Sequence, residues 1–256
     1  MTQSLTRADE RLFIALRQRD QRQERGLFLA EGVRLVEELV ASHFAIEIAA
    51  VAPALEDTER GHLLAAALAA RTRVRNVSAA TLQRIAATEA PQGVVAIGQI
   101  PVAQFDDIPV TGNATGLVLD AIQDPGNFGT LVRSADAFGA AFVLALDGTV
   151  DPWNPKSVRA TAGSAFRVPI FQSGTAEAIG QLRRQKVRLL VADSGGAAPG
   201  ARGEGPIALA IGNEGAGVRP ELRQAADGVI AIPVRGAVES LNAAVAGSIL
   251  LYLLTR

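Results

Sequence analysis

The sequence predicts an α/β protein of two domains, the second built on a mostly parallel sheet. Strand-like apolar runs alternate with helical periodicity along almost the whole chain of 256 residues. Residues 101–115 carry two prolines and little periodicity, which indicates a linker between domains at 1–100 and 116–256. The strand-like runs of the second half are nearly all apolar, as expected of parallel strands that helices cover on both faces.

The first domain is predicted to alternate helices and strands. Residues 5–20 place Leu5, Leu12 and Leu16 among arginines and predict an amphipathic helix. The later elements are expected in the order strand 26–32, helix 33–42, strand 45–52, helix 58–73, strand 74–78, helix 78–86 and strand 93–100. Ser78 is expected to be an N-cap, because its hydroxyl can accept from the first free amides of a helix.

The second domain is predicted to contain six strands and five helices. The strands are expected at 116–122, 141–147, 166–170, 187–193, 207–212 and 228–233. The helices are expected at 128–138, 155–163, 175–185, 219–225 and 240–254. Such an arrangement places ligands at the carboxyl edge of the sheet.

Composition excludes several classes of site. The chain has no cysteine and two histidines, so thiolate chemistry and a histidine-rich metal site are excluded, and no metal is expected. The first residues lack the apolar core of a signal peptide, and no apolar tract reaches the ~20 residues of a spanning helix. We therefore expect a cytoplasmic protein without a membrane segment. The net charge of -1 disfavours nucleic-acid binding. Arginines, however, concentrate in the first 34 residues. They could form an RNA-binding surface or lie on a solvated helix face, and the sequence supports both alternatives about equally.

Three turns after strands of the second half carry polar side chains. In the first, Asn127 is expected to cap a helix that begins near Phe128, and Arg133 could reach back over the turn. In the second, Glu214 lies among glycines that allow close backbone approach, from Gly212 to Gly217. Each turn alone would pass for an ordinary cap or tight turn. Neither Gly-x-Gly-x-x-Gly nor Gly-Lys-Ser/Thr occurs, so dinucleotide-binding and P-loop enzymes are poor alternatives.

The third turn precedes the last helix. Ser240 is expected to be its N-cap, and Asn242 to lie in its first turn near unsatisfied amides. Leu241, Val245 and Ile249 are expected on the inner face of this helix.

Together these turns resemble the motifs of the SpoU/TrmH family of SPOUT RNA methyltransferases. The resemblance rests on Asn127-x-Gly129-x-x-x-Arg133, on residues 212–217, and on Ile232-Pro233 followed by 239–243, in that order over residues 116–256. Residues 155–169 resemble the family's Lys/Arg-containing helix. The first half, through Glu31-Gly32 and 91–93, is similar to the L30e-like substrate-binding domain of rRNA-directed members.

The resemblance implies a fold, a reaction and a set of site residues. The second domain would contain a trefoil knot, would bind S-adenosylmethionine, and would form a homodimer with the site at the subunit interface. The reaction would be methyl transfer to a ribose 2′-hydroxyl of RNA, with 23S rRNA preferred. Catalytic roles would belong to Arg133, Asn127, Glu214, Ser240 and Asn242. Cofactor contacts would come from Gly212, Ile232 and Leu241. RNA contacts are expected from Arg17, Arg22, Arg25, Lys156 and Arg159.

Several alternatives stay open at this point. The substrate could be tRNA, or the protein could be a non-catalytic RNA-binding paralogue that acts in ribosome assembly. An antibiotic-resistance methyltransferase of rRNA would have the same organisation. A guanidinium is normally protonated, which makes Arg133 an awkward base, so Arg133 could orient the hydroxyl and stabilise the alkoxide, or act as the base itself if desolvated.

Overall fold

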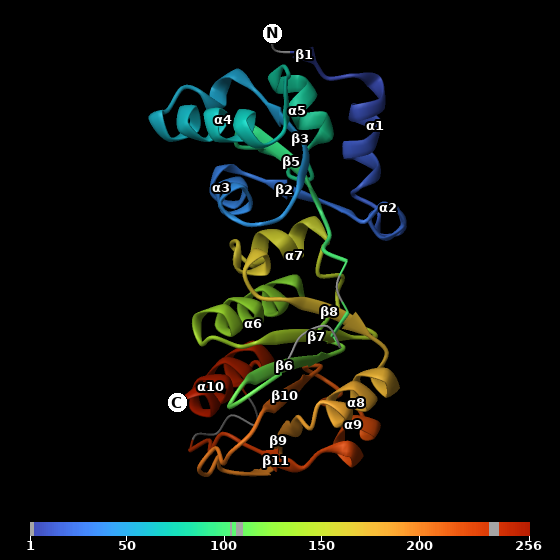
Figure 1. Ribbon diagram of the computed structural model, residues 1–256, viewed down its shortest axis with the longest axis vertical. Coiled ribbons are helices and arrows are strands. Elements are labelled where there is room, and N and C mark those ends of the chain that lie inside the picture. The colour runs from blue at the N-terminus through green and yellow to red at the C-terminus, as the bar shows by residue number, and fades with distance from the viewer. Residues whose placement is uncertain (1–2, 103, 106–109, 236–240) are drawn as a thin grey trace. The chain divides into compact units, whose positions relative to one another are not determined.

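The computed structural model describes residues 3–102, 104–105, 110–235 and 241–256. Its contacts divide the chain into two compact units. Unit 1 comprises Met1–Val102 together with Trp153–Phe166, and unit 2 comprises Ala103–Pro152 together with Arg167–Arg256. The return of residues 153–166 to unit 1 is a feature that chain order does not suggest. Figure 1 labels the elements of both units.

Unit 1 is built on a five-stranded mixed sheet. Its strand order is β1 (Gln3–Ser4), β4 (Arg73–Asn76), β3 (Ile46–Val51), β5 (Val94–Gln99) and β2 (Leu27–Glu31). β1, β4 and β3 are parallel, whereas β5 pairs antiparallel with β3 and β2. The helices are α1 (Arg7–Ala15), α2 (Arg19–Arg25), α3 (Val33–Ala41), α4 (Glu59–Arg71) and α5 (Ala79–Ile85). Ser78 caps α5 through a bond from the Thr81 amide, as predicted.

The helix predicted at 5–20 is in fact two helices. α1 ends at Ala15, with Leu16 as its C-cap, and α2 begins only at Arg19. The buried Arg22 donates to the carbonyls of Leu16 (2.9 Å) and Arg17 (2.8 Å). These carbonyls, which a continuing helix would have used, are thereby satisfied in the break between the helices.

Residues from the second half of the chain complete the core of unit 1. Trp153 lies 4.9 Å from Phe28, ring centre to ring centre, and Phe166 lies 5.4 Å from Phe44. Between them, α7 (Pro155–Ala160) packs on β2. Because Phe166 belongs to this aromatic cluster, residues 164–166 form a 3-10 turn, and the strand predicted at 166–170 begins only at Ile170.

Unit 2 is built on a six-stranded, fully parallel sheet. The strand order is β11 (Gly228–Ile230), β9 (Arg188–Ala197), β10 (Ile207–Gly212), β6 (Thr115–Asp120), β7 (Phe142–Leu146) and β8 (Ile170–Ser173). Two apolar clusters cover its two faces. One packs α6 (Pro125–Ala137) and α10 (Ala243–Thr255) on the sheet, and the other packs α8 (Thr175–Arg184) and α9 (Pro220–Ala225). Figure 1 shows these pairs on opposite sides of the strands. The mostly parallel sheet predicted for the second domain is confirmed.

Part of the predicted linker packs on unit 2. Phe105 is buried against Phe142, 4.6 Å away between ring centres. The Gln185 side chain donates to the carbonyl oxygen of Phe105 at 3.2 Å and accepts from the amide of Val110 at 3.3 Å. These contacts hold both sides of the undescribed residues 106–109 on unit 2.

Candidate functional site

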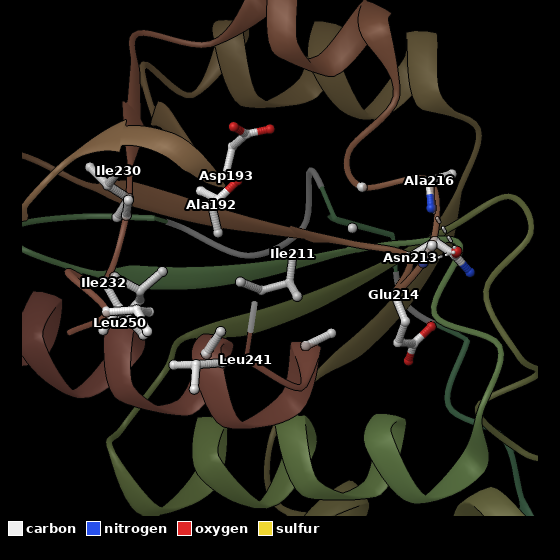
Figure 2. Close-up of a pocket in the computed structure, with 18 residues that line it drawn as sticks. Ala192, Asp193, Ile211, Asn213, Glu214, Ala216, Ile230, Ile232, Leu241 and Leu250 are labelled. Carbon is white, nitrogen blue, oxygen red and sulfur yellow. Dashed lines mark hydrogen bonds between the residues drawn. The ribbon is translucent and has the colours of Figure 1, made fainter. Parts of the chain in front are cut away.

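A cavity of about 320 Å³ opens at the carboxyl edge of the unit 2 sheet. Its walls come from the middle of β9, the end of β10, the loop that follows each of β10 and β11, and α10. The lining residues are Ala192–Ser194, Ile211–Gly217, Ile230–Ile232, Val234, Leu241, Ala243, Ala246 and Leu250. Figure 2 shows Ile230, Ile232 and Leu250 toward one end of the cavity and Glu214 toward the other. The cavity is therefore apolar at one end and polar at the other, as small-molecule sites commonly are.

The loop after β10 is a tight turn that requires glycine. A Cβ on Gly212 would lie 2.1 Å from the carbonyl carbon of Gly217 and 2.3 Å from the Val218 nitrogen. Gly217 itself has φ +68°, a conformation that favours glycine. The amides and carbonyls of Asn213 and Gly217 bond reciprocally, at 3.1 and 2.9 Å. This closed turn presents Glu214 and backbone groups to the cavity.

Asn213 bonds this loop to Ala121, the residue that follows β6, and the sequence did not reveal this role. Its Nδ2 donates to the carbonyl of Ala121 at 3.0 Å, and its Oδ1 accepts from the amides of Gly215 and Ala216. The motif contains Asn213, but an asparagine in a glycine-rich turn is usually a local turn former, and its partner 92 residues away leaves no local signal.

Three of the predicted catalytic residues meet in one hydrogen-bonded row. Asn127 Nδ2 donates to Glu214 Oε1, and Asn242 Nδ2 donates to Asn127 Oδ1 at 3.1 Å. Asn242 Oδ1 also accepts from the amides of Ala244 and Val245. The three side chains come from α6, the loop after β10 and the start of α10, so the row joins the three turns that the sequence singled out. It is accessible to solvent and contains carboxylate, carbonyl and amide groups, which suit a ligand with hydroxyl groups.

The capping roles differ from those predicted. Asp124, not Asn127, is the N-cap of α6 and accepts from the Asn127 amide at 2.8 Å. Asn242, not Ser240, is the N-cap of α10. As N3 of its helix, Asn127 has a side chain free to bridge Glu214 and Asn242. Ser240 itself lies outside the described residues.

The inner face of α10 was also predicted wrongly. Val245 and Ile249 are 47% and 38% exposed, and Leu241 precedes the helix. The buried residues are Ala244, Gly247, Leu250, Leu251 and Leu254. The helix begins at Ala243 rather than near 240, so its inward face follows a different set of positions.

Arg133 does not join the row. It is exposed on α6, and no hydrogen bond or ion pair connects it to any residue that the structure describes. It lies six positions after Asn127, about 120° around the helix.

All three residues predicted to contact a cofactor line the cavity: Gly212, Ile232 and Leu241. Its described walls carry two carboxylates, Asp193 and Glu214, and no lysine or arginine. The pKa of Asp193 is lowered by the bond from the Gly195 amide and, next, by the bond from Arg223. The carboxylate of Asp193 is paired with Arg223 of α9, so Glu214 is the carboxylate of the described walls that is left for a ligand.

The predicted RNA contacts in unit 1 divide into two groups. Arg22 is 1% exposed and bonded to backbone carbonyls, so the structure argues against it as an RNA contact. Arg17 is committed in the same way, to the carbonyls of Arg84 and Ala86. Arg25 and Lys156 are exposed, and Arg159 lies 3.8 Å from Glu31 with a partly exposed side chain. Arg25, Lys156 and, in part, Arg159 remain accessible.

Two further features are absent from the described residues. No cluster of three or more histidine, aspartate or glutamate side chains there could hold a metal ion. No described helix is both long and apolar enough to cross a membrane.

Comparison with known proteins matches both halves of the chain. The SpoU rRNA Methylase family matches residues 114–252, and the MRM3-like substrate binding domain matches residues 11–96. The chain is 33% identical to the 23S rRNA (guanosine(2553)-2'-O)-methyltransferase RlmP of Bacillus subtilis, over 93% of this chain and 92% of the relative.

Two solved structures are similar over nearly their whole length. An AdoMet-bound rRNA methyltransferase from Sinorhizobium meliloti has a TM-score of 0.85 and 32% identity, covering 98% of this chain and 95% of that one. The SpoU methyltransferase AviRb from Streptomyces viridochromogenes, in complex with the cofactor AdoMet, has a TM-score of 0.86 and 29% identity, covering 98% of both chains.

Proposed function

The chain belongs to the SpoU rRNA Methylase family, and from this premise we propose that it transfers a methyl group from S-adenosylmethionine to a ribose 2′-hydroxyl of large-subunit rRNA. The single observation that carries the proposal is the cavity with the row Glu214–Asn127–Asn242 at its polar end. The reaction named for the relative RlmP supports the substrate class. Since rRNA is made and modified where ribosomes assemble, we place the reaction in the cytoplasm.

The residues of the cavity fit S-adenosylmethionine. Gly212 lets the loop close against the backbone of Gly217 and Val218, where a Cβ would clash, and this closed turn forms the cradle at the cavity wall. Backbone groups of Gly212, Ile232 and Leu241 would hold the cofactor, and the carboxylate of Glu214 suits a positive charge on it. When bound, it supplies an electrophilic methyl group on a sulfonium centre. No metal takes part in this proposal.

The protein side of the reaction is orientation and charge stabilisation. Asn127, Glu214, Asn242 and Ser240 would orient the ribose through its hydroxyls. Holding two reactants in place can contribute about 7–11 kcal/mol to the lowering of a barrier. As the 2′-oxygen bonds to the methyl carbon, the carbon–sulfur bond would break and S-adenosylhomocysteine would leave. The hydroxyl proton would pass to solvent water, which reaches the exposed row, and the exposed guanidinium of Arg133 would stabilise the developing alkoxide while remaining protonated.

A second subunit would supply partners for the exposed Arg133. The outer face of α10 exposes Val245, Ile249, Tyr252 and Leu253, each between 38% and 47%. α10 also packs beside α6, the helix that carries Arg133. We therefore propose a homodimer that buries this apolar face and places Arg133 next to the site.

The dimer can be tested with a matched pair of substitutions. Ile249→Asp should give monomers in light scattering, because a carboxylate would be buried in the interface. Leu63→Asp, at a more exposed leucine of α4 in unit 1 (67%), should leave the dimer intact. A monomeric wild-type protein, or a dimeric Ile249→Asp variant, would contradict this interface.

The trefoil knot and the domain roles are further parts of the proposal. The position of β10 between β9 and β6, with α10 packed on α6, supports a C-terminal segment that threads as in a knotted domain. The match of residues 11–96 to a substrate binding domain supports RNA binding by unit 1. Arg25, Lys156 and Arg159 would provide its phosphate contacts.

The cofactor site makes a sharp prediction at Gly212. Gly212→Ala should weaken S-adenosylmethionine binding about 10–100-fold, since the new methyl group meets rigid backbone and opens the turn. Isothermal titration calorimetry measures the change. Gly200→Ala, at a glycine with no atom within 4 Å of the added Cβ, is the matched control. Equal affinities for the two variants would refute this description of the cradle.

The function itself is tested by methyl-labelled S-adenosylmethionine with total bacterial RNA, followed by fractionation and alkaline hydrolysis. We expect label in large-subunit rRNA at an alkali-resistant 2′ position. Label confined to tRNA would overturn the substrate but keep the reaction. Absence of label, on mature RNA and on immature ribosomal subunits alike, would favour a non-catalytic RNA-binding protein.

A further inference from the structure

Arg219 makes a set of contacts that the proposed reaction has not used. It follows the loop 213–218 and is the N-cap of α9. Its amide and its Nε donate to the two oxygens of Asp120, at 2.7 and 2.6 Å. Its Nη1 donates to Thr175 Oγ1 at 2.5 Å, and its Nη2 to the carbonyl of Asp147 at 2.6 Å. One side chain therefore joins the end of the loop to three other segments of unit 2.

The partner carboxylate is almost completely buried. Asp120 ends β6 and is 1% exposed. Both of its oxygens accept hydrogen bonds from Arg219, which compensates for a charge that burial would otherwise make unfavourable. Asp147 follows β7, and Thr175 begins α8. The planar guanidinium carries several N–H donors in fixed directions and can bond to all of these acceptors at once, whereas an ammonium group cannot.

The other end of the same loop is attached to Ala121, the residue that directly follows β6. Asn213 Nδ2 donates to the carbonyl of Ala121, which has a positive φ of 55°. From Ala121 the chain runs on to Asp124, which caps α6 and accepts from the amide of Asn127. Both ends of the loop that carries Glu214 are thus bonded to Asp120 and Ala121. These two residues precede α6, the helix on which Asn127, the partner of Glu214, lies.

We propose that Arg219 is a positioning residue, which through its buried pair with Asp120 holds the loop 213–218 so that Glu214 meets Asn127 and the cofactor cavity keeps its shape. This inference rests on the proposed methyl transfer and assigns the residue that aligns its site. The cavity wall moves if the pair is lost, because Gly212–Gly217 line it. RNA recognition by unit 1 uses none of these residues.

The test compares Arg219→Lys with Arg167→Lys in the full-length protein. Arg167 pairs with Asp136 in the same unit, away from the cavity. Arg219→Lys should raise the Kd for S-adenosylmethionine about tenfold and lower kcat, because bonds to a buried charged group are lost. The KM for rRNA should stay within about twofold of wild type, a change below 0.5 kcal/mol. Arg167→Lys should match wild type in all three quantities.

Thr175→Val provides a milder variant if Arg219→Lys does not fold. It removes only the acceptor of Nη1 and should raise the cofactor Kd about threefold. An unchanged cofactor Kd in a folded variant would overturn the proposal. So would a parallel loss of cofactor binding, RNA binding and thermal stability, which indicates a merely structural role. A wild-type protein that binds no S-adenosylmethionine would overturn the proposed function, and this inference with it.

Discussion

Replacing Arg133 with alanine should lower kcat for methyl transfer by about 10²–10³-fold, as the loss of one group that stabilises a developing oxyanion does in other enzymes. Arg133 is exposed and has no partner among the described residues, so its removal leaves no buried group unsatisfied. The thermal midpoint and the cofactor Kd should therefore remain close to wild type. Single-turnover methylation of rRNA, with calorimetry for the cofactor, measures these quantities.

Arg183→Ala is the matched control for this substitution. Arg183 is likewise exposed and lies in the last turn of α8, on the opposite face of the sheet from α6. It should methylate at the wild-type rate. Arg133→Lys separates two roles, since it keeps the positive charge and should retain part of the activity if stabilisation of the alkoxide dominates. Methylation by Arg133→Ala at the wild-type rate would remove Arg133 from the reaction.

Cutting the chain after residue 102 should leave the first 102 residues unable to fold. The fragment loses Trp153 and Phe166, which are 5% and 2% exposed and pack against Phe28 and Phe44. Loss of one large buried aromatic side chain costs about 3–5 kcal/mol, and whole domains are stable by about 5–15 kcal/mol. Circular dichroism of the fragment should show no cooperative thermal transition.

Restoring the missing segment is the control for the fragment. A fusion of residues 1–102 to residues 153–166 through a flexible Gly/Ser linker should recover a cooperative transition. Trp153 is the only tryptophan of the chain, so its fluorescence reports directly on the folding of unit 1 in the fusion and in the full protein. A cooperative transition in the bare 1–102 fragment, equal to that of the fusion, would show that the segment is dispensable for the core.

The secondary structure could be predicted wherever it depended on residues close together in the sequence. The apolar strands of the second half predicted a parallel sheet, because side chains buried on both faces leave no alternation. Ser78 was recognised as a cap, since capping involves only the next few residues. The caps of α6 and α10 were misassigned by a few positions, because several cap-forming residues lie side by side in both turns.

The sequence identified residues that belong to the candidate site, but it did not show which of them contact one another. Asn127, Glu214 and Asn242 were picked out from three separate motifs, and the structure brings them into one hydrogen-bonded row. Periodicity did not reveal that Arg22 is buried, because an arginine among polar residues has the pattern of a surface position. Its burial follows from carbonyls left free where α1 ends.

By itself, the sequence determined the class of fold, the family and the three turns at the carboxyl edge, because each depends on residues close together in the chain. Only the tertiary structure decided that residues 153–166 complete unit 1, and that Arg219 is fixed to Asp120 across 99 positions. The physical reason is that long-range partners are selected by burial and by the need to satisfy buried polar groups. Those conditions exist only once the strands have been brought together.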